Sequence, residues 1–186
     1  MGRWEPNARG RLEEAALELY LEDGFDQTTV AGIAARAGLS ERTFFRHYAD
    51  KREVLFGGAS FLQTLLVESV AAAPDDVAPI DAIAAALEQA GTFMQERRPH
   101  SLQRQAVINA NPLLQERELI KMARLASALA ETLRDRGVAE PAATLTAEAG
   151  IAVFRVAFET WIDPDETRDL PQVIRDSLGW LRTVTA

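Results

Sequence analysis

The chain has 186 residues, a formal net charge of −8 and no cysteine. This length allows one large or two small domains, and the lack of cysteine excludes disulfides and thiolate chemistry. The sequence starts without a charged segment followed by an apolar leader and contains no apolar run of about 18 residues, so we expect a soluble, cytoplasmic protein without membrane contact.

A short N-terminal arm carries Arg3 and Trp4. An arm with an arginine is suited to a DNA minor groove, but a frayed end whose tryptophan rests on the first helix is the simpler interpretation. Residues 8–23 then predict an amphipathic helix, because apolar side chains recur at helical spacing. Near its start, Arg9 and Arg11 are suited either to a DNA phosphate or to solvent.

Residues 28–52 predict two short helices joined by a tight turn, with a further helix starting directly after them. Thr29 and Ser40 stand where a hydroxyl accepts a hydrogen bond from the first turn of a helix. Gly38 stands where a left-handed residue ends the first of these helices. Phe44 and Tyr48, four positions apart, are expected on the buried face of the second. This spacing is typical of a helix-turn-helix.

The opposite face of the second helix, about 40–48, carries side chains suited to DNA. Arginine fits guanine edges and phosphates, and threonine and histidine are short hydrogen-bonding groups. The segment 36–52 holds five basic and two acidic residues, so it is locally basic in an acidic chain. An ordinary solvated helix face is the competing interpretation. The candidate DNA contacts are Thr29, Ser40, Arg42, Thr43, Phe45, Arg46, His47, Lys51 and Arg52. We expect the last two to bind phosphate at a helix N-terminus.

A long pattern of residues extends over this region. It comprises Ala15, Ala16, Leu19, Gly24, Phe25, Thr28, Thr29, Val30, Ile33, Ala34, Ala37, Gly38, Leu39, Ser40, Thr43, Phe44, Phe45, His47, Tyr48 and Lys51. By this pattern, residues 9–56 resemble the DNA-binding head of the TetR family of transcriptional regulators. Many members carry Gly where Arg42 stands, and Tyr where Phe45 stands. That Tyr commonly reaches a phosphate, so we expect Phe45 to lack this hydrogen bond.

Beyond the head, a long helix is expected over about 51–73, and the prolines and acids of 74–79 form the clearest break. Further helices are expected over about 80–97, 100–110, 112–136, 142–161 and 169–184, without strand-like alternation. The sequence therefore predicts an all-α fold of about nine helices. We expect a helix-turn-helix DNA-binding domain over 1–56 and an effector-binding and dimerisation domain over 57–186.

The last two helices carry more apolar residues than a one-sided stripe needs. The residues are Leu145, Ala149, Ala152, Val153, Val156 and Ala157 in one helix, and Leu170, Val173, Ile174, Leu178, Trp180 and Leu181 in the other. The family resemblance implies that these helices pair with their twins in a homodimer. A dimer would present two heads about 34–36 Å apart to a palindromic operator in double-stranded DNA. The alternative is that the two helices only fill a monomer core.

The resemblance also implies a small apolar or amphipathic effector, whose identity the residues do not specify. Candidates to line its pocket are Phe61, Leu65, Phe93, Met94, Arg97, Leu125, Phe154, Phe158 and Trp161. Aromatic and methionine residues at helical spacing are more often core residues than ligand contacts. Gln105 and Asn109 are further polar candidates.

Enzyme chemistry finds little support in the sequence. His47 and His100 lie in different segments, and there is no Gly-rich phosphate loop or nucleophile motif. We therefore expect no enzyme, no metal and no cofactor. Most simply, the resemblance implies a repressor that its ligand releases from the operator. The alternatives are an activator of the same fold and a helical ligand-binding module without DNA-binding activity, which Phe45 and the negative net charge would favour.

Overall fold

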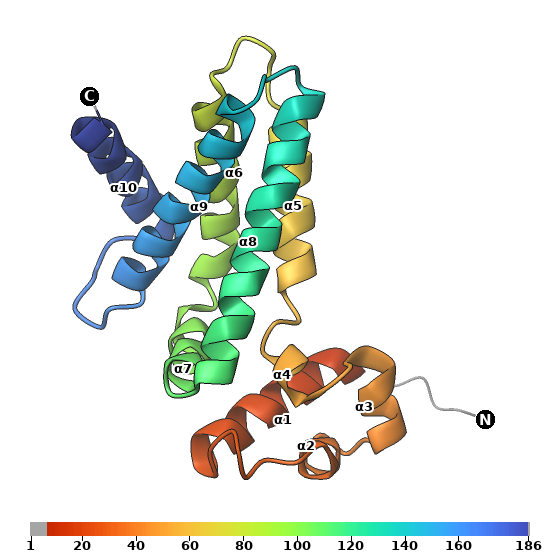
Figure 1. Ribbon diagram of the computed structural model, residues 1–186. Helices are drawn as coiled ribbons and strands as arrows, with labels where there is room; N and C mark the ends of the chain where they lie inside the picture. Colours follow the sequence, from red (N-terminus) through yellow and green to blue (C-terminus); the bar gives the residue numbers. More distant parts are fainter. Residues whose placement is uncertain (1–6, 186) are drawn as a thin grey trace. The chain divides into compact units, whose positions relative to one another are not determined.

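A computed structural model of the chain describes residues 7–185 (Figure 1), so the predicted arm with Arg3 and Trp4 lies outside the described residues. Ten helices and no strand occur over the described range, which confirms the all-α prediction. None of these described helices is long and apolar enough to cross a membrane. The helices divide into two compact units, one from residues 1–58 and 100–118 and the other from residues 59–99 and 119–186.

The first unit begins with four helices whose starts follow local capping rules. They are α1 (Ala8–Glu22), α2 (Val30–Arg36), α3 (Glu41–His47) and α4 (Lys51–Val54). The Thr29 hydroxyl accepts from the Gly32 N–H at 3.0 Å, and the Ser40 hydroxyl accepts from the Thr43 N–H at 3.2 Å. Both predicted N-caps are therefore confirmed, because each oxygen satisfies a backbone donor that the helix leaves unpaired.

The turn between α2 and α3 depends on Gly38. Its φ of +66° lies in the left-handed region, and a guanidinium nitrogen of Arg11 lies 2.7 Å from the point where a Cβ would stand. The Leu39 N–H donates to the Ala34 carbonyl at 2.8 Å across this turn. A side chain at Gly38 would therefore strain the backbone and displace the Arg11 guanidinium. The turn predicted from the sequence is confirmed.

The core of the first unit includes two segments from later in the chain. Val107 and Ile108 belong to α7 (Arg98–Asn109), and Leu114 belongs to α8 (Pro112–Asp135). All three are buried in the same cluster as Phe44 and Tyr48. The compact unit around the head therefore includes residues 100–118 in addition to the stretch in which the sequence places the DNA-binding domain.

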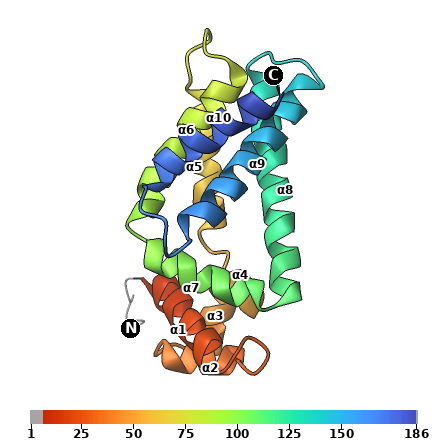
Figure 2. The same ribbon diagram turned by 90° about the vertical axis from the view of Figure 1, so that its left-hand side faces the viewer.

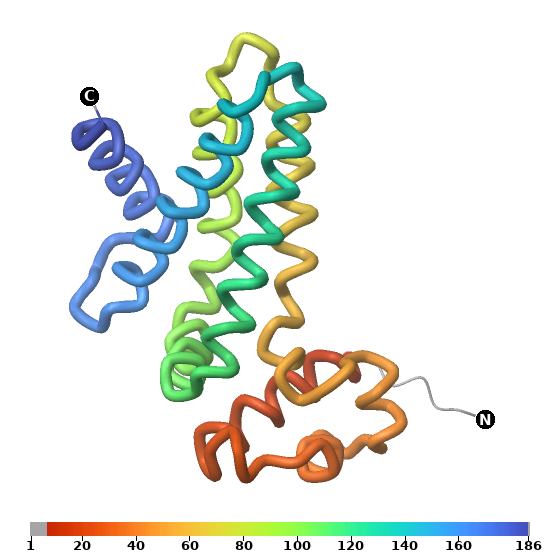
Figure 3. Tube along the Cα trace, in the orientation of Figure 1, coloured from red at the N-terminus to blue at the C-terminus, as the bar shows by residue number. Residues whose placement is uncertain are grey.

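The predicted helix over 51–73 is wrong, because the chain leaves its helical path between α4 and α5 (Ala59–Ala71), as Figure 3 shows. Leu55 and Phe56, between the two helices, are buried in the first unit's core. Gly57 follows them, and a Cβ there would lie 2.1 Å from a carboxylate oxygen of Glu13 and 2.9 Å from the Tyr48 hydroxyl. The stretch is thus shaped by burial rather than by continuation of a helix.

The second unit contains α5, α6 (Pro79–Gln95), the later part of α8, α9 (Ala142–Trp161) and α10 (Leu170–Thr185). Figure 2 shows α10 lying along α6 and α9, and α5 packs on α6. The core of this unit holds Leu66, Ile83, Leu129 and Trp161, none of which is exposed. An amphipathic stripe on each helix explains this packing.

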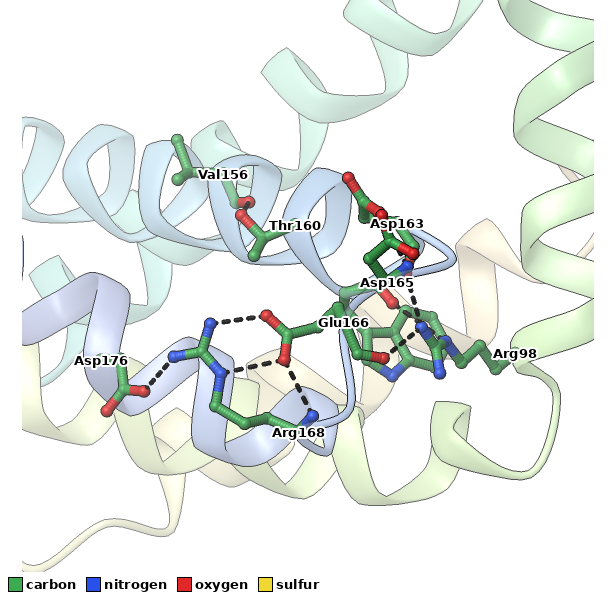
Figure 4. Close-up of polar contacts among 9 residues, drawn as sticks. Arg98, Val156, Thr160, Asp163, Asp165, Glu166, Arg168 and Asp176 are labelled. Atoms are coloured by element: carbon green, nitrogen blue, oxygen red, sulfur yellow. Dashed lines mark hydrogen bonds and ion pairs between the residues drawn. The ribbon is translucent and has the colours of Figure 1, made fainter.

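Arg98 holds the connection between α9 and α10 (Figure 4). Its Nε donates to the Trp161 carbonyl at 3.0 Å, and its Nη2 donates to the carbonyls of Asp163 at 2.7 Å and Glu166 at 2.8 Å. The bond to Trp161 satisfies a carbonyl that the end of α9 leaves without a helical partner, and the other two hold the loop that follows. Arg168 in turn donates to Glu166 and lowers the pKa of that carboxyl group to about 2. The acidic turn is therefore an ordered helix connection.

Candidate DNA-binding surface

The outward face of α3 carries cationic and aromatic side chains. Arg42, Phe45, Arg46 and His47 are all exposed, whereas Phe44 between them is fully buried. In the described part of the chain, neither Arg42 nor Arg46 has a hydrogen bond or an ion pair. Two guanidinium groups are thus available to an external acceptor on this face.

Buried rings and local hydroxyl groups fix the orientation of α3. The Phe44 ring packs against Tyr48, with centroids 5.8 Å apart, and meets Phe45 nearly edge-on at 5.5 Å. The hydroxyl groups of Ser40 and Thr43 lie 3.0 Å apart and bond to each other. The hydroxyl groups of Ser40 and Thr43, like that of Thr29, therefore already have partners within the head.

Lys51 is the first residue of α4, as the sequence suggested, and its side chain is engaged within the head. Its ammonium group donates to the carbonyls of Phe25 at 2.7 Å, Thr28 at 2.8 Å and Asp26 at 3.3 Å, and lies 4.4 Å from the centre of the Phe25 ring. An ammonium group has three N–H donors, and three carbonyls accept them here. Lys51 thus ties the start of α4 to the loop before α2, and its phosphate contact stays a prediction.

Arg52 is also engaged within the head. Its guanidinium pairs with the Asp50 carboxylate at 2.5 Å, and this carboxylate caps α4 by accepting from the Arg52 N–H at 2.8 Å. The guanidinium of Arg52 lowers the pKa of the Asp50 carboxyl group, and the backbone bonds add to this effect. The Asp50 carboxylate thus lies at the N-terminus of α4, where a negative charge is favourable, and phosphate binding by Arg52 stays a prediction.

Arg36 is the remaining member of the basic segment. Its guanidinium pairs with Glu22 at 2.7 Å and with Glu18 at 3.1 Å, both on α1. Two carboxylates thus offset one cation. The positive charge that the segment 36–52 presents on α3 is concentrated in Arg42 and Arg46.

A polar network that no sequence pattern indicated joins Tyr48 to α1. The Tyr48 hydroxyl donates to Glu13 at 2.7 Å and accepts from Arg9 at 3.2 Å, and Arg9 also donates to the Gly57 carbonyl. Burial and the bond to Glu13 raise the pKa of the Tyr48 phenol above its ordinary value. Arg9 therefore binds groups within the head rather than projecting freely into solvent. Arg11 likewise donates to the Ala37 carbonyl.

A second network joins α4 to the segment 100–118. Arg104 donates to the Leu55 carbonyl at 2.7 Å and pairs with Glu118 at 3.1 Å, while Arg117 pairs with Glu53. Burial lowers the pKa of Arg104. Contacts between residues so distant in sequence leave no local pattern, which is why sequence analysis missed them.

The polar effector candidates Gln105 and Asn109 also lie in the first unit. The Gln105 amide donates to Asn109 at 3.0 Å and to Glu118 at 3.1 Å, so both side chains are part of the same network.

The predicted effector residues lie on different parts of the second unit. Leu125, Phe154 and Trp161 are buried in its core, and partly buried Leu65, Met94 and Phe158 pack against that core. Arg97 is exposed. Phe61 and Phe93 form an exposed pair between α5 and α6, with centroids 4.8 Å apart. A separate groove of about 460 Å³ between α6 and α10 includes none of them and is lined by Asp81, Ala84, Ala85, Glu88, Arg175, Leu178, Gly179 and Arg182.

Not all of the apolar residues of α9 and α10 are used in the core of the second unit. Val153, Ala157, Leu170, Val173, Ile174 and Leu178 are buried. Leu145 and Val156 of α9 are 64% and 56% exposed, and Trp180 and Val184 of α10 are 70% and 76% exposed. Leu145 and Val156 are three helical turns apart and share one face. The two helices therefore keep an apolar surface that the described residues of the chain do not cover.

Comparison with known families matches two parts of the chain. Residues 12–56 match the family described as bacterial regulatory proteins, tetR family. Residues 77–186, more than half of the chain, match the MftR C-terminal domain. The first match covers the helix-turn-helix, and the second covers α6 to α10.

Individual proteins give the same result. The chain is 36% identical over 78 residues to the HTH-type transcriptional regulator TcmR of Streptomyces glaucescens, covering 42% of this chain and 34% of that protein. It is 30% identical over 115 residues to the putative mycofactocin biosynthesis transcriptional regulator MftR of Mycobacterium tuberculosis, covering 62% and 58%. The chain thus spans less than two thirds of the length of either relative.

A solved structure with a similar fold is Thermus thermophilus FadR, a TetR family transcriptional repressor in complex with lauroyl-CoA. The TM-score is 0.56 at 24% identity, with 94% of this chain and 93% of that chain covered. These relatives are transcriptional regulators and not enzymes, in agreement with the sequence analysis. The two family matches together show that the chain belongs to the TetR family of bacterial transcriptional regulators.

Proposed function

We propose that the chain is a cytoplasmic, homodimeric repressor that binds a palindromic operator through α3 and is released from it by a small apolar or amphipathic ligand. The observation that carries this proposal is the outward face of α3, where Arg42 and Arg46 are exposed without a partner among residues 7–185. A cation that no carboxylate offsets is available to phosphates and guanine edges.

The distribution of charge favours specific over non-specific DNA binding. Non-specific affinity depends on the number of phosphates that cations neutralise, and Arg36, Lys51 and Arg52 are already engaged within the head. Since two guanidinium groups remain on α3, we expect a modest salt dependence per head. Because each head would make few contacts with the DNA phosphates, contacts with the bases should contribute much of the affinity.

The exposed apolar residues of α9 and α10 support a homodimer. A surface that displays Leu145, Val156, Trp180 and Val184 resembles the apolar centre of an interface rather than an ordinary solvated surface. A second copy of the chain is the partner that fits a palindromic operator. Two heads related by a twofold axis bind the two equivalent halves of a palindrome.

The aromatic pair of Phe61 and Phe93 supports an apolar or amphipathic ligand. Both rings are more than half exposed although they contact each other, so they offer apolar area to a bound molecule. FadR of Thermus thermophilus binds lauroyl-CoA, a ligand with an apolar chain. Such a ligand would regulate only if it binds the DNA-competent and DNA-incompetent forms with different affinity.

Fluorescence anisotropy with the full chain and the DNA that flanks its gene, at several salt concentrations, tests the proposal. We expect saturable binding of two chains per palindromic site, tighter than binding to scrambled DNA. Sedimentation gives the oligomeric state, and the changes Val156→Asp and Trp180→Asp should produce monomers. A folded dimer that binds no DNA sequence preferentially would favour the ligand-binding module without DNA-binding activity. Transcription in vitro with and without the protein distinguishes repression from activation.

A further inference from the structure

One stripe of α3 carries a cation, an aromatic ring and a second cation. Phe45 and Arg46 follow Arg42 by three and four positions, so both project from the side of the helix that carries Arg42. Phe45 is 56% exposed, an unusual position for a phenylalanine on a helix that is otherwise polar on this side. The buried Phe44 ring meets it nearly edge-on, at an interplanar angle of 82°, which fixes the direction of the exposed ring.

Phe45 has no hydrogen-bonding group and cannot contact a phosphate as a donor. If α3 enters a major groove, the ring needs an apolar partner there. The thymine C5-methyl group is the apolar group that base edges present in that groove. The neighbouring guanidinium groups of Arg42 and Arg46 fit the O6 and N7 atoms of guanine.

The spacing of the three side chains limits how far apart their targets lie. Arg42 and Arg46 are four residues apart, which corresponds to a rise of about 6 Å along a helix. Neighbouring base pairs are about 3.4 Å apart, so three such side chains reach about three consecutive base pairs. A single helix can therefore contact a thymine and a guanine in one short run.

We infer that Phe45 determines operator specificity by contacting a thymine methyl group, in a half-site where Arg42 or Arg46 reads a guanine within about two base pairs of that thymine. This inference rests on the proposed function and deepens it, because it names the base recognised by this face of α3. It follows from the chain's own residues, Arg42 and Phe45, at positions where many family members have Gly and Tyr.

The test begins with selection of binding sites from a randomised DNA duplex library by the full chain. Each thymine of the selected half-site is then replaced by deoxyuracil, which lacks only the methyl group. For one thymine we expect about fourfold weaker binding, the ratio given by burial of one methyl group. In the variant Phe45→Ala the same replacement should have no effect, and Phe45→Leu should keep part of it. Because Phe45 is exposed, we expect these variants to fold, and circular dichroism checks this.

Modified guanines test the arginines in the same half-site. Replacement of the guanine by 7-deazaguanine removes N7 and should weaken binding about tenfold, since one of two paired hydrogen bonds is lost. Inosine keeps both O6 and N7 and lacks only the minor-groove amino group, so it should bind as guanine does. The 7-deazaguanine effect should disappear in either Arg42→Ala or Arg46→Ala, which identifies the arginine responsible.

Two results would overturn the inference while leaving the proposed function intact. One is a selected half-site in which every thymine tolerates deoxyuracil, and the other is an equal deoxyuracil effect in Phe45→Ala and the unmodified chain. Failure to enrich any sequence, with the chain folded, would instead overturn the proposed function itself.

Discussion

The exposed face of α3 and the start of α4 carry the same kind of side chain and use it differently. Arg42 and Arg46 have no partner among the described residues, while Lys51 donates to three carbonyls and Arg52 pairs with Asp50. Both places are basic by sequence alone. The difference teaches that the charge available to a ligand depends on neighbouring acceptors and not on the number of basic residues.

The cause lies in the loop that precedes α2. Carbonyl oxygens of Phe25, Asp26 and Thr28 converge on the Lys51 ammonium group beside the start of α4. A carbonyl without a partner is costly inside a folded unit, and one ammonium group satisfies several of them. On the outer side of α3 no such acceptors converge on Arg42 or Arg46 in the described structure, so these guanidinium groups stay available.

The largest effect that we predict is on stability, for the change Lys51→Met. Removing a cation with three carbonyl acceptors should lower the free energy of unfolding by about 3 kcal/mol. Urea denaturation followed by circular dichroism measures this loss. The salt dependence of DNA binding, measured under conditions where the head is folded, should stay unchanged.

Arg42→Met is the matched control, because it removes an exposed cation of similar size. It should leave the free energy of unfolding nearly unchanged. If Arg42 contacts a phosphate, the slope of the logarithm of the binding constant against the logarithm of the salt concentration should become less steep by about one unit. If Arg42 contacts a base, the preference for the operator over other sequences should fall instead. The comparison fails if Lys51→Met behaves in this way and keeps its stability, since Lys51 would then be a phosphate contact.

Capping and turn signals made much of the head predictable from the sequence. Thr29, Ser40 and Gly38 act on backbone atoms within a few residues, so their positions in the sequence define where α2 and α3 begin and where α2 ends. The exposed face of α3 followed from the same reasoning, because residues three and four apart share one side of a helix.

Distant partners made the rest unpredictable. Leu55 and Phe56 continue an apolar pattern, and only their burial in the first unit reveals that the helix stops before them. The role of Lys51 depends on carbonyls 23 to 26 positions earlier in the chain. Likewise, the place of Val107 and Ile108 in the head's core depends on packing rather than on local pattern.

The next effect in size is that of Arg46→Ala on operator binding. Loss of a guanidinium that contacts a base or phosphate should weaken specific binding by about 1–3 kcal/mol. Anisotropy against the selected operator measures this change. Arg36→Ala is the control, because Glu18 and Glu22 already pair with Arg36, and we expect its affinity to remain unchanged. Equal losses in the two variants would indicate a general electrostatic effect rather than contact by α3.

A smaller effect is expected for Arg52→Ala. Because Asp50 offsets the charge of Arg52 and caps α4 itself, loss of this guanidinium should change DNA affinity by less than about twofold. The same anisotropy titration measures it. A loss as large as that of Arg46→Ala would show that Arg52 leaves Asp50 when DNA binds.

The smallest predicted effect is the pH dependence of the same variant. Arg52 lowers the pKa of Asp50 in the folded head, so the Asp50 carboxylate stabilises the fold above its ordinary pKa of about 3.9, and this stabilisation is lost as the pH falls through the lowered value. In Arg52→Ala the pKa of Asp50 should rise, although the N–H bonds of the capped turn still lower it. The stability difference between the unmodified chain and the variant should therefore be present at pH 7 and shrink below about pH 4. Urea midpoints at several pH values measure it, and a difference that stays constant into acid would mean that Arg52 does not act through the Asp50 carboxylate.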